Sequence, residues 1–261
     1  MVALITGGGR GIGRAVALRL AKNGWDVAIA ARSADELSAT ARECGGRTLA
    51  ITADVASPEQ VHAMVQRTES ELGPIDLLVN NAGVAGPLLP FVETDPADWW
   101  HVQEVNVRGP MLCCHEVVPG MIRRGRGRIL NLASGAGGFA IPNMGPYALS
   151  KAAIIRFSEQ LALELAPHGI QVFPIRPGVV RTRMVEAVRQ RVPVVQKFLD
   201  DGRDAPPEAT ADLVEYIASG KADALSGYVL SVRENWDEMV RRAEEIQREQ
   251  MYLLRMREFP S

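Results

Sequence analysis

Short apolar runs recur along the chain, separated by longer stretches in which apolar residues return with a helical period. Because these runs are apolar throughout and do not alternate with polar residues, they are typical of strands buried on both faces of a parallel sheet. Right-handed crossovers would place the intervening helices on both sides of that sheet. The pattern predicts an α/β fold with a doubly wound, seven-stranded parallel sheet, whose strands we expect at residues 2–5, 26–31, 48–53, 75–80, 128–133, 170–175 and 228–232.

A long connection after the sixth expected strand departs from this alternation. Residues 183–207 combine two apolar stretches and end in the residues D-A-P-P. Long insertions at the carboxyl end of a strand often act as lids over a binding site. We therefore predict a substrate lid over 183–207, and a pair of ordinary surface helices is the alternative.

The end of the chain carries a second departure. Asn235, followed three residues later by Glu238, predicts a capped helix over residues 235–258. The apolar stripe of this helix could pack on its own core, on another subunit or over the substrate cleft, and the spacing leaves all three open. The stripe consists of Trp236, Met239, Val240, Ala243, Ile246, Gln250 and Leu253.

Composition limits the function classes. The chain has 261 residues, of which 47% are hydrophobic, and its formal net charge is -2. This apolar content suffices for one sizeable core, so we expect residues 1–261 to form a single domain. A pI of about 6.1 gives no basic footprint for nucleic acid, and no apolar run approaches membrane-spanning length.

The three cysteines are Cys44, Cys113 and Cys114. They form neither an even disulfide framework nor a metal-ligand spacing. We expect a reducing environment and no metal site. Since the first residues enter a strand without the pattern of a secretory signal, the sequence predicts a cytoplasmic protein.

A glycine-rich turn follows the first expected strand. The residues T-G-G-G-R-G-I-G occupy positions 6–13 and lead into a helical segment. A helix amino terminus directs backbone N–H groups at an anion, and absent side chains permit a tight turn and a close approach, which suits a pyrophosphate. The spacing is not G-x-G-x-x-G. A glycine turn without a ligand is the alternative to a cofactor site made of Gly7, Gly9, Arg10, Gly11, Ile12 and Gly13.

The end of the second strand indicates which dinucleotide would bind. An acidic residue at this place often binds the ribose hydroxyls of NAD, but this chain has Ala31 and Arg32 there. Arg32 and Arg10 could together bind a 2'-phosphate. The sequence predicts a preference for NADP(H), with NAD(H) possible, and the alternative is that Arg32 is a solvated surface residue.

Candidate acid–base chemistry lies in the second half of the chain. Tyr147 and Lys151 are four residues apart, which places them on one face of a helix. The ammonium of Lys151 could lower the pKa of a phenol from its usual value of about 10 and so prepare it for proton transfer. This pair occurs often by chance. Its context favours catalysis, because Ser134 ends a buried strand and would bring a hydroxyl to the same edge of the sheet.

Seven motifs together resemble the short-chain dehydrogenase/reductase family in its compact single-domain form, which has a Rossmann-type fold. The resemblance covers about residues 1–230, and the chain continues beyond the usual end. The motifs are T-G-G-G-R-G-I-G at 6–13, D-V at 54–55, N-N-A-G at 80–83, the Asn of V-N-V at 105–107, Ser134, Y-A-L-S-K at 147–151 and P-G-V-V-R-T at 177–182.

The resemblance implies roles for further residues near a bound cofactor. Asp54 and Val55 would flank the adenine, and Asn81, Ala82 and Gly83 would line the cofactor near its ribose. Asn81 could equally satisfy nearby backbone groups. The stretch 177–182 would meet the nicotinamide carboxamide through Pro177, Gly178, Val180 and Thr182.

For the chemistry, the resemblance implies a tetrad of Asn106, Ser134, Tyr147 and Lys151. Tyr147 would be the acid/base that exchanges a proton with the substrate oxygen, and Ser134 would hydrogen-bond that oxygen. Lys151 would also bond the nicotinamide ribose. Asn106 would hold a water in a proton relay to the lysine, although a structural bond to the backbone is equally open.

The substrate is a small carbonyl or alcohol compound in this prediction. We expect a mainly apolar pocket, while Arg181, Arg183 and Arg189 could bind an acidic group. The usual oligomeric state of the family implies a homodimer or homotetramer. A dinucleotide-binding sensor without turnover, or a dehydration or isomerisation enzyme, are the alternatives. The expected pocket residues are Phe139, Ile141, Pro142, Met144, Met184, Val185, Val194, Val195, Phe198 and Leu199.

Overall fold

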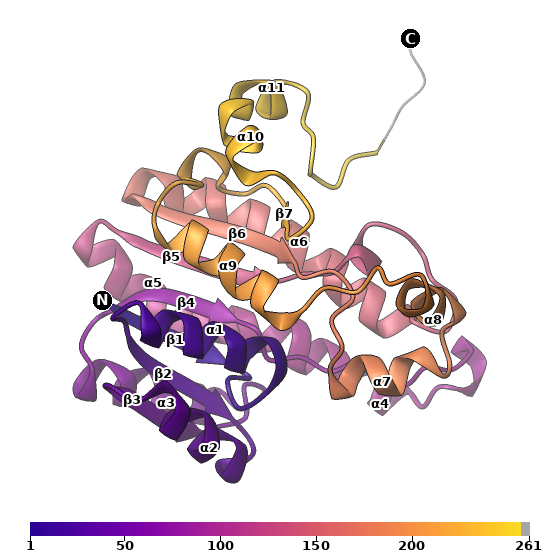
Figure 1. The fold of residues 1–261 in the computed structure, drawn as a ribbon, viewed down its shortest axis with the longest axis horizontal. Coiled ribbons are helices and arrows are strands. Elements are labelled where there is room, and N and C mark those ends of the chain that lie inside the picture. Colours follow the sequence, from indigo (N-terminus) through magenta and orange to yellow (C-terminus); the bar gives the residue numbers. More distant parts are fainter. Residues whose placement is uncertain (257–261) are drawn as a thin grey trace.

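A parallel sheet of seven strands forms the centre of the molecule in the computed structural model, which describes residues 1–256 (Figure 1). The strand order is β3-β2-β1-β4-β5-β6-β7, which confirms the predicted fold class. Every neighbouring pair is parallel. The strands are β1 (Val2–Thr6), β2 (Asp26–Ala31), β3 (Thr48–Thr52), β4 (Ile75–Asn80), β5 (Gly127–Leu132), β6 (Ile170–Arg176) and β7 (Leu230–Ser231).

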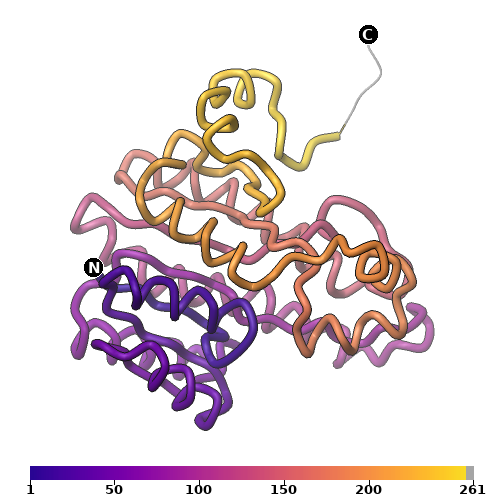
Figure 2. Tube along the Cα trace, viewed as in Figure 1, coloured from indigo at the N-terminus to yellow at the C-terminus, as the bar shows by residue number. Residues whose placement is uncertain are grey.

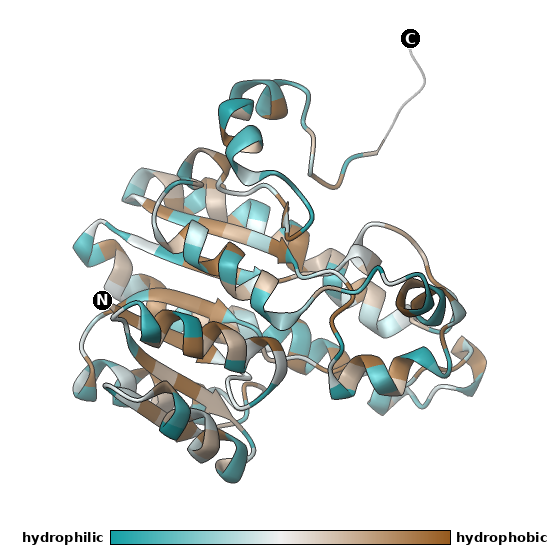
Figure 3. Ribbon diagram, in the orientation of Figure 1, coloured by the Kyte–Doolittle hydropathy of each residue, from teal (hydrophilic) through white to brown (hydrophobic). Residues whose placement is uncertain are grey.

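Helices cover both faces of the sheet. The first face carries α1 (Gly11–Lys22), α2 (Ala34–Cys44) and α9 (Pro207–Ala218), and the second carries α3 (Pro58–Glu71), α5 (Gly109–Arg124) and α6 (Gly145–Leu165). Each face has its own apolar core cluster. The strands are accordingly the most hydrophobic part of the ribbon, and polar residues lie on the outer sides of the helices (Figure 3).

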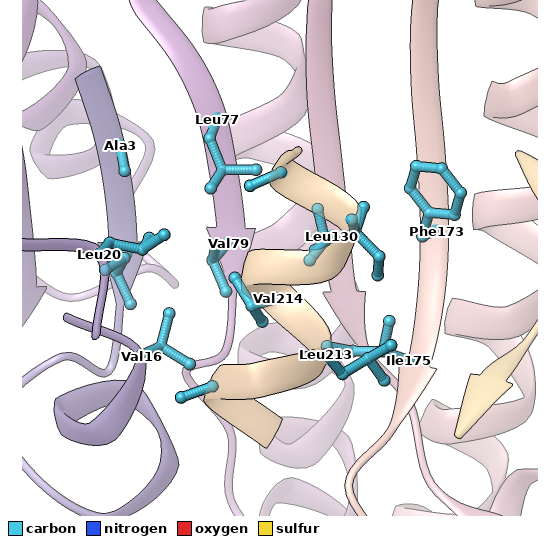
Figure 4. Packing of buried hydrophobic residues seen from close by; sticks show 14 of the residues in the cluster. Ala3, Val16, Leu20, Leu77, Val79, Leu130, Phe173, Ile175, Leu213 and Val214 are labelled. Atoms are coloured by element: carbon cyan, nitrogen blue, oxygen red, sulfur yellow. The ribbon is translucent and has the colours of Figure 1, made fainter. Parts of the chain in front are cut away.

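The packing of α9 against the sheet shows how the first core is built (Figure 4). Leu213 of α9 lies beside Ile175 of β6 and Val214 beside Val79 of β4, and all four are fully buried. Helix α1 lies alongside α9 and contributes Leu20 to the same core. Removing one such buried leucine side chain typically costs about 3–5 kcal/mol, so this layer holds the first strands in place beneath the glycine turn.

The segment predicted as a lid contains two helices, α7 (Arg183–Arg189) and α8 (Pro193–Asp200). Both lie beyond the carboxyl ends of the strands (Figures 1 and 2). Helix α4 (Pro96–Gln103) packs against α6. An isolated parallel bridge between Val180 and Ala205 ties the two ends of this segment together. The helices are therefore held at the edge where the strands end.

The end of the chain differs from the single helix expected over 235–258. Two short helices, α10 (Trp236–Arg241) and α11 (Ala243–Arg248), are followed by irregular chain, and residues 257 and 258 lie outside the described part. Asn235 caps α10 as predicted, accepting a bond from Glu238 N at 3.0 Å. Of the three placements left open, the stripe takes the first, because its buried members join the core of the first face. These members are Met239, Ala243 and Ile246.

Candidate active site

A cleft of about 540 Å³ opens at the carboxyl ends of the strands. It lies where the strand order reverses, because the chain moves outward from β1 to β2 and β3 and then returns to β4 on the other side of β1. Crossovers diverge at such a point and leave a crevice that is not filled by a helix. We call this the first cleft.

The glycine turn forms the floor of the first cleft. Gly7 and Gly11 have φ angles of 66° and 54°, a region that disfavours side chains. A Cβ at Gly13 would come within 2.3 Å of the Gly7 carbonyl oxygen, so only glycine lets α1 begin this close to β1. The residues present therefore fit a pyrophosphate, which needs a bare backbone and the N–H groups of a helix start.

Asn81 holds this turn from the end of β4. Its side-chain Nδ2 donates to the carbonyls of Thr6 at 2.9 Å and Gly7 at 3.1 Å. The Thr6 hydroxyl in turn accepts from the backbone N–H of Asn81. The structural role considered for Asn81 is thus present, and the same residue also lines the first cleft.

Charged side chains surround the end of the first cleft that is expected to hold the adenosine. Arg10 and Arg32 both line it. Glu36 lines it too, and its carboxylate accepts from Arg10 at 3.2 Å and from Arg183 of α7 at 2.7 Å. The sequence argument missed Glu36, because it considered only the end of β2 and not the first turn of α2. Asp54, which is expected to flank the adenine, lines the cleft as well, and three arginines against two carboxylates still leave this end positive.

Most of the predicted cofactor residues come together in the first cleft. Three do not line it: Gly13 lies under the turn, Gly178 faces a neighbouring cavity, and Val180 is buried against Ala205. The predicted residues that line the first cleft are Gly7, Gly9, Arg10, Gly11, Ile12, Arg32, Asp54, Val55, Asn81, Ala82, Gly83, Tyr147, Lys151, Pro177 and Thr182.

Tyr147 and Lys151 lie in the first two turns of α6. The Nζ of Lys151 is 5.6 Å from the centre of the Tyr147 ring and donates a hydrogen bond of 2.6 Å to the carbonyl of Leu132, at the end of β5. Lys151 itself is only 6% exposed. The amine is thus fixed between α6 and β5, next to the phenol, as the four-residue spacing predicted.

The pKa values of this pair differ from the expected ones. Burial raises the pKa of Tyr147 above its ordinary value, and a hydrogen bond with the Ser134 side chain acts in the opposite direction. Burial lowers the pKa of Lys151 to about 8. The expected lowering of the phenol's pKa by the ammonium is therefore not found, because withdrawal from water, which disfavours the charged form of each group, is the largest effect on both.

Ser134 reaches Tyr147 because the loop after β5 packs closely on α6. The Ser134 hydroxyl accepts from Ala136 N at 3.2 Å at the start of a 3-10 turn, Gly135–Gly137. A Cβ at Gly137 would lie 2.7 Å from the carbonyl carbon of Lys151. A larger residue there would push the loop, and with it Ser134, away from α6.

Asn106 sits in a short π-helix, Glu104–Arg108, between α4 and α5. Its side-chain oxygen accepts from Val84 N at 2.8 Å, and its Nδ2 donates to Val84 O at 2.9 Å and to the Ser150 hydroxyl at 3.0 Å. Ser150 then donates to the carbonyl of Tyr147 at 2.7 Å. Asn106 lines neither the first cleft nor the cavity beside it, and these bonds connect the loop after β4 to the start of α6.

A second cavity, of about 320 Å³, adjoins the first cleft. Tyr147 lines both of them, Lys151 lines the first cleft, and Ser134 lines the second cavity. Helices α7 and α8 supply much of its apolar wall. The predicted pocket residues found there are Phe139, Ile141, Met144, Met184, Val185, Val194, Val195 and Phe198, whereas Pro142 and Leu199 do not line it.

The charged residues of the second cavity were not predicted. The three arginines proposed from the sequence lie elsewhere: Arg181 pairs with Asp204, Arg183 with Glu36 and Arg189 with Glu186, each at 2.7 Å. Three other charged residues line it instead. They are Arg176, at the end of β6, and Arg233 and Glu234, which follow β7.

Residues 1–256 contain neither a helix suited to span a membrane nor a cluster of metal-ligating side chains. No helix within residues 1–256 combines the length and apolarity needed to cross a bilayer. Over the same range, no group of three or more His, Cys, Asp or Glu side chains could hold a metal ion.

The chain is similar in sequence to proteins of one family. The family model described as short chain dehydrogenase matches residues 1–193. A short-chain dehydrogenase/reductase of Armillaria gallica is 36% identical, over 88% of this chain and 94% of the relative. A 3-oxoacyl-[acyl-carrier-protein] reductase of Synechocystis is 34% identical, also over 88% of this chain and 94% of the relative.

Solved structures match over similar lengths. An actinorhodin polyketide ketoreductase with NADPH has a TM-score of 0.82 at 34% identity, over 90% of this chain and 97% of the other. A 3-ketoacyl-(acyl-carrier-protein) reductase from Brucella melitensis, complexed with NADH, has a TM-score of 0.82 at 31% identity, over 88% of this chain and 96% of the other.

Proposed function

The chain belongs to the short-chain dehydrogenase/reductase family and is an NAD(P)-dependent oxidoreductase of carbonyls and alcohols; from this premise we propose that it interconverts a ketone and a secondary alcohol with Tyr147 as the acid/base. The observation that carries the proposal is the position of Tyr147. Its side chain lines both the first cleft and the second cavity, so its hydroxyl borders the space for a cofactor and the space for a substrate.

In the reduction direction Tyr147 donates its proton to the carbonyl oxygen of the substrate. The raised pKa of its phenol keeps it protonated through the neutral range, which suits a proton donor. When bound in the first cleft, the nicotinamide supplies or accepts the hydride. In the oxidation direction the phenolate of Tyr147 removes the proton of the alcohol.

Ser134 and Lys151 assist from opposite sides. The Ser134 hydroxyl lines the second cavity and donates a hydrogen bond to the substrate oxygen, stabilising the charge that develops there. The ammonium of Lys151, beside the Tyr147 ring, stabilises the phenolate and binds the nicotinamide ribose from the first cleft. A pKa of about 8 leaves most of this amine protonated at neutral pH.

In this proposal Asn106 does not contact the substrate but holds other residues of the site in position. Its bonds to Val84 and to the Ser150 hydroxyl link the loop after β4 with the first turn of α6, which carries Tyr147. This network supports a structural role at least as directly as a water relay to Lys151, whose amine points to the Leu132 carbonyl. We keep Asn106 as a positioning residue for the tetrad.

For the cofactor we propose a preference for NADP(H), with NAD(H) accepted less well. The proposal is supported by Arg10, Arg32 and Arg183, which outnumber the carboxylates at the expected adenosine end of the first cleft, Glu36 and Asp54. A 2'-phosphate would find planar guanidinium donors there. One similar structure was solved with NADPH and another with NADH, so this fold can bind either cofactor.

We further propose a homodimer or homotetramer in a cytoplasmic setting. Three large apolar side chains on α4 and α6 support assembly: Trp100, Leu149 and Leu163 are 60%, 51% and 69% exposed. The free cysteines fit a reducing environment, and both adjacent ones are buried. Light scattering that gave the mass of a stable monomer would exclude the assembly.

The mechanism is tested by Tyr147→Phe, which removes one hydroxyl and keeps the ring. Wild-type protein is expected to oxidise NADPH with at least one ketone from a panel of aliphatic, cyclic and aromatic ketones. The variant is expected to lose about 100-fold or more in kcat, because general acid catalysis contributes about 10²- to 10⁴-fold.

Two measurements keep this experiment decisive. Quenching of protein fluorescence by NADPH should give the same Kd for both proteins, which shows that the variant is folded. Tyr228→Phe, a matched loss of a hydroxyl at a residue that lines neither space, should keep full activity. Undiminished turnover by Tyr147→Phe would rule out the mechanism, and NADPH binding without turnover of any ketone by the wild type would favour the sensor.

A further inference from the structure

Charged side chains form one part of the lining of the second cavity, although most of that lining is apolar. Phe139, Ile141 and Val188 belong to the apolar part. Arg176 and Glu234 stand together at the ends of β6 and β7, where Arg176 is paired in register with Ser231. We call Arg176, Arg233 and Glu234 the charged end of the second cavity. An apolar ketone has no charged group that could pair with these side chains.

Arg176 has unused hydrogen-bonding capacity. Its Nε is buried and has no acceptor among residues 1–256. The nearest carboxylate oxygen, from Glu234, is 4.0 Å from its NH2 nitrogen, which is beyond hydrogen-bond length. A buried guanidinium N–H without an acceptor is costly, and such groups normally have a partner. The Nε itself is closed to a ligand, but the Arg176 side chain as a whole is 35% exposed and lines the cavity, so its terminal nitrogens can meet an acceptor there.

Arg233 is held in place without a carboxylate. Its guanidinium lies 5.5 Å from the centre of the Phe198 ring and donates to the carbonyl of Arg203. The Phe198 ring and the Arg203 carbonyl fix the orientation of the Arg233 guanidinium, and neither of them neutralises its positive charge. Arg233 is thus prepared to bind an anion at the rim of the cavity.

The balance of charge indicates which anion would fit. Two guanidinium groups and one carboxylate leave a single net positive charge at the charged end. A carboxylate has one negative charge, whereas a phosphate monoester has about 1.5 to 2 near neutral pH. Arginine also matches the two oxygens of a carboxylate with two parallel N–H donors.

Resting on the proposed function, we propose that the substrate is an amphipathic ketone or alcohol with one carboxylate. Arg176 and Arg233 bind that carboxylate. The apolar body of the substrate lies against α7 and α8, and its reacting oxygen meets Tyr147 and Ser134 in the same cavity.

The experiment compares keto acids with their methyl esters, which have the same carbon skeleton without the charge. The probes are levulinate, para-acetylbenzoate and para-acetylphenylpropionate, which place the carboxylate at increasing distances from the ketone. With NADPH, at least one acid is expected to exceed its ester about 10- to 100-fold in kcat/KM, mainly through a lower KM, as for one or two charged hydrogen bonds.

Substitutions then locate the preference. Arg176→Leu and Arg233→Leu should raise the KM for the acid about 10-fold or more and leave the ester unchanged. Arg176→Lys should keep part of the preference. Arg189→Leu is the matched control, because Arg189 lies on the lid but lines neither space, and it should behave as the wild type. If Arg176→Leu fails to fold, Arg233→Leu and Arg176→Gln take its place.

Calorimetric titration of the same probes into the Tyr147→Phe protein with NADPH measures the preference when no turnover occurs. Tighter binding of an acid than of its ester, lost in the arginine variants, supports the inference. Equal or absent binding of all three acids, or a preference that survives both leucine variants, overturns it. Turnover of the esters with no advantage for the acids would overturn it as well and leave the role of Tyr147 intact.

Discussion

The amine of Lys151 is withdrawn from water, and its burial has an energetic cost. In the folded protein its pKa is about 8, against 10.5 for the ordinary amine. Below the lower value both folded and unfolded chains carry the charge, and folding bears the cost of burying it. Between the two values only the unfolded chain binds the proton, so this cost fades as the pH rises.

The first residue-scale prediction uses Lys151→Met, which removes the buried charge. At neutral pH the variant is expected to be more stable than the wild type, or less destabilised than the loss of the bond to Leu132 would suggest. As the pH rises from neutral to above the ordinary lysine pKa, the free energy of unfolding of the wild type should increase relative to that of the variant by about 3 kcal/mol. Urea unfolding at a series of pH values measures it.

Lys197→Met is the control for that series, since Lys197 is an exposed lysine on α8. Its stability difference from the wild type should stay flat with pH. A flat difference for Lys151→Met as well would mean that the amine keeps an ordinary pKa in the folded protein, and the argument from burial would be wrong.

The second residue-scale prediction concerns the cofactor. Arg32→Asp replaces a guanidinium of the first cleft with a carboxylate, which repels a 2'-phosphate and can accept from ribose hydroxyls. The ratio of kcat/KM for NADPH to that for NADH is expected to fall about 10- to 100-fold. Steady-state kinetics with one ketone substrate and both cofactors measures the ratio.

Arg42→Asp makes the same charge change on the exposed side of α2, away from the first cleft. It should leave the cofactor ratio within a factor of about two, because screened surface charges contribute little. An unchanged ratio in Arg32→Asp would show that Arg32 is the solvated surface residue considered as the alternative.

At the scale of elements, close packing brings Ser134 and Tyr147 together. The loop after β5 can carry Ser134 to Tyr147 only because Gly137 lets it touch α6. The π-helix at Asn106 is stabilised by partners that lie far away in sequence, Val84 and Ser150. Such a turn was not predictable from local pattern, since the pattern around 104–108 is that of an ordinary helix.

The last helical segment shows the same limit in another way. The apolar stripe correctly indicated a buried face, and Asn235 correctly indicated where the first helix begins. The stripe did not reveal that the helix breaks at Arg242 and that the chain turns back, with Gln250 and Tyr252 at positive φ. Tertiary contacts decide where this chain leaves the helix, because Tyr252 O accepts from Val229 N beside β7.

At the scale of the whole molecule, the C-terminal segment fastens the chain to its own core. Beyond the buried stripe, Arg255 pairs with Glu159 at 2.6 Å, and Arg156 donates to Leu254 O at 2.5 Å. Both contacts attach residues after α11 to α6, the helix that carries Tyr147 and Lys151. The segment therefore serves stability first, and assembly is expected to depend on other surfaces.

Truncation after Arg233 tests this assignment. The shortened protein loses two large buried side chains, Met239 and Ile246, each worth about 2–5 kcal/mol. Urea unfolding should show a correspondingly large loss of stability, while light scattering at low temperature should give the same number of subunits. A chain ended at Met256 controls for shortening itself. Unchanged stability with loss of assembly would instead assign the stripe to a subunit interface.

The sequence by itself determined the sheet, its buried strands, the glycine turn and the Tyr147–Lys151 pair. These features depend on neighbours in sequence: a run of apolar residues, a turn that only glycine permits, and a helical spacing of four. Only the tertiary structure decided which charges share a space. Glu36 lies beside Arg10, and Arg176 shares the second cavity with Arg233, although the members of each pair are far apart in sequence. The direction of the Tyr147 pKa was likewise decided by burial, which depends on everything packed around the group.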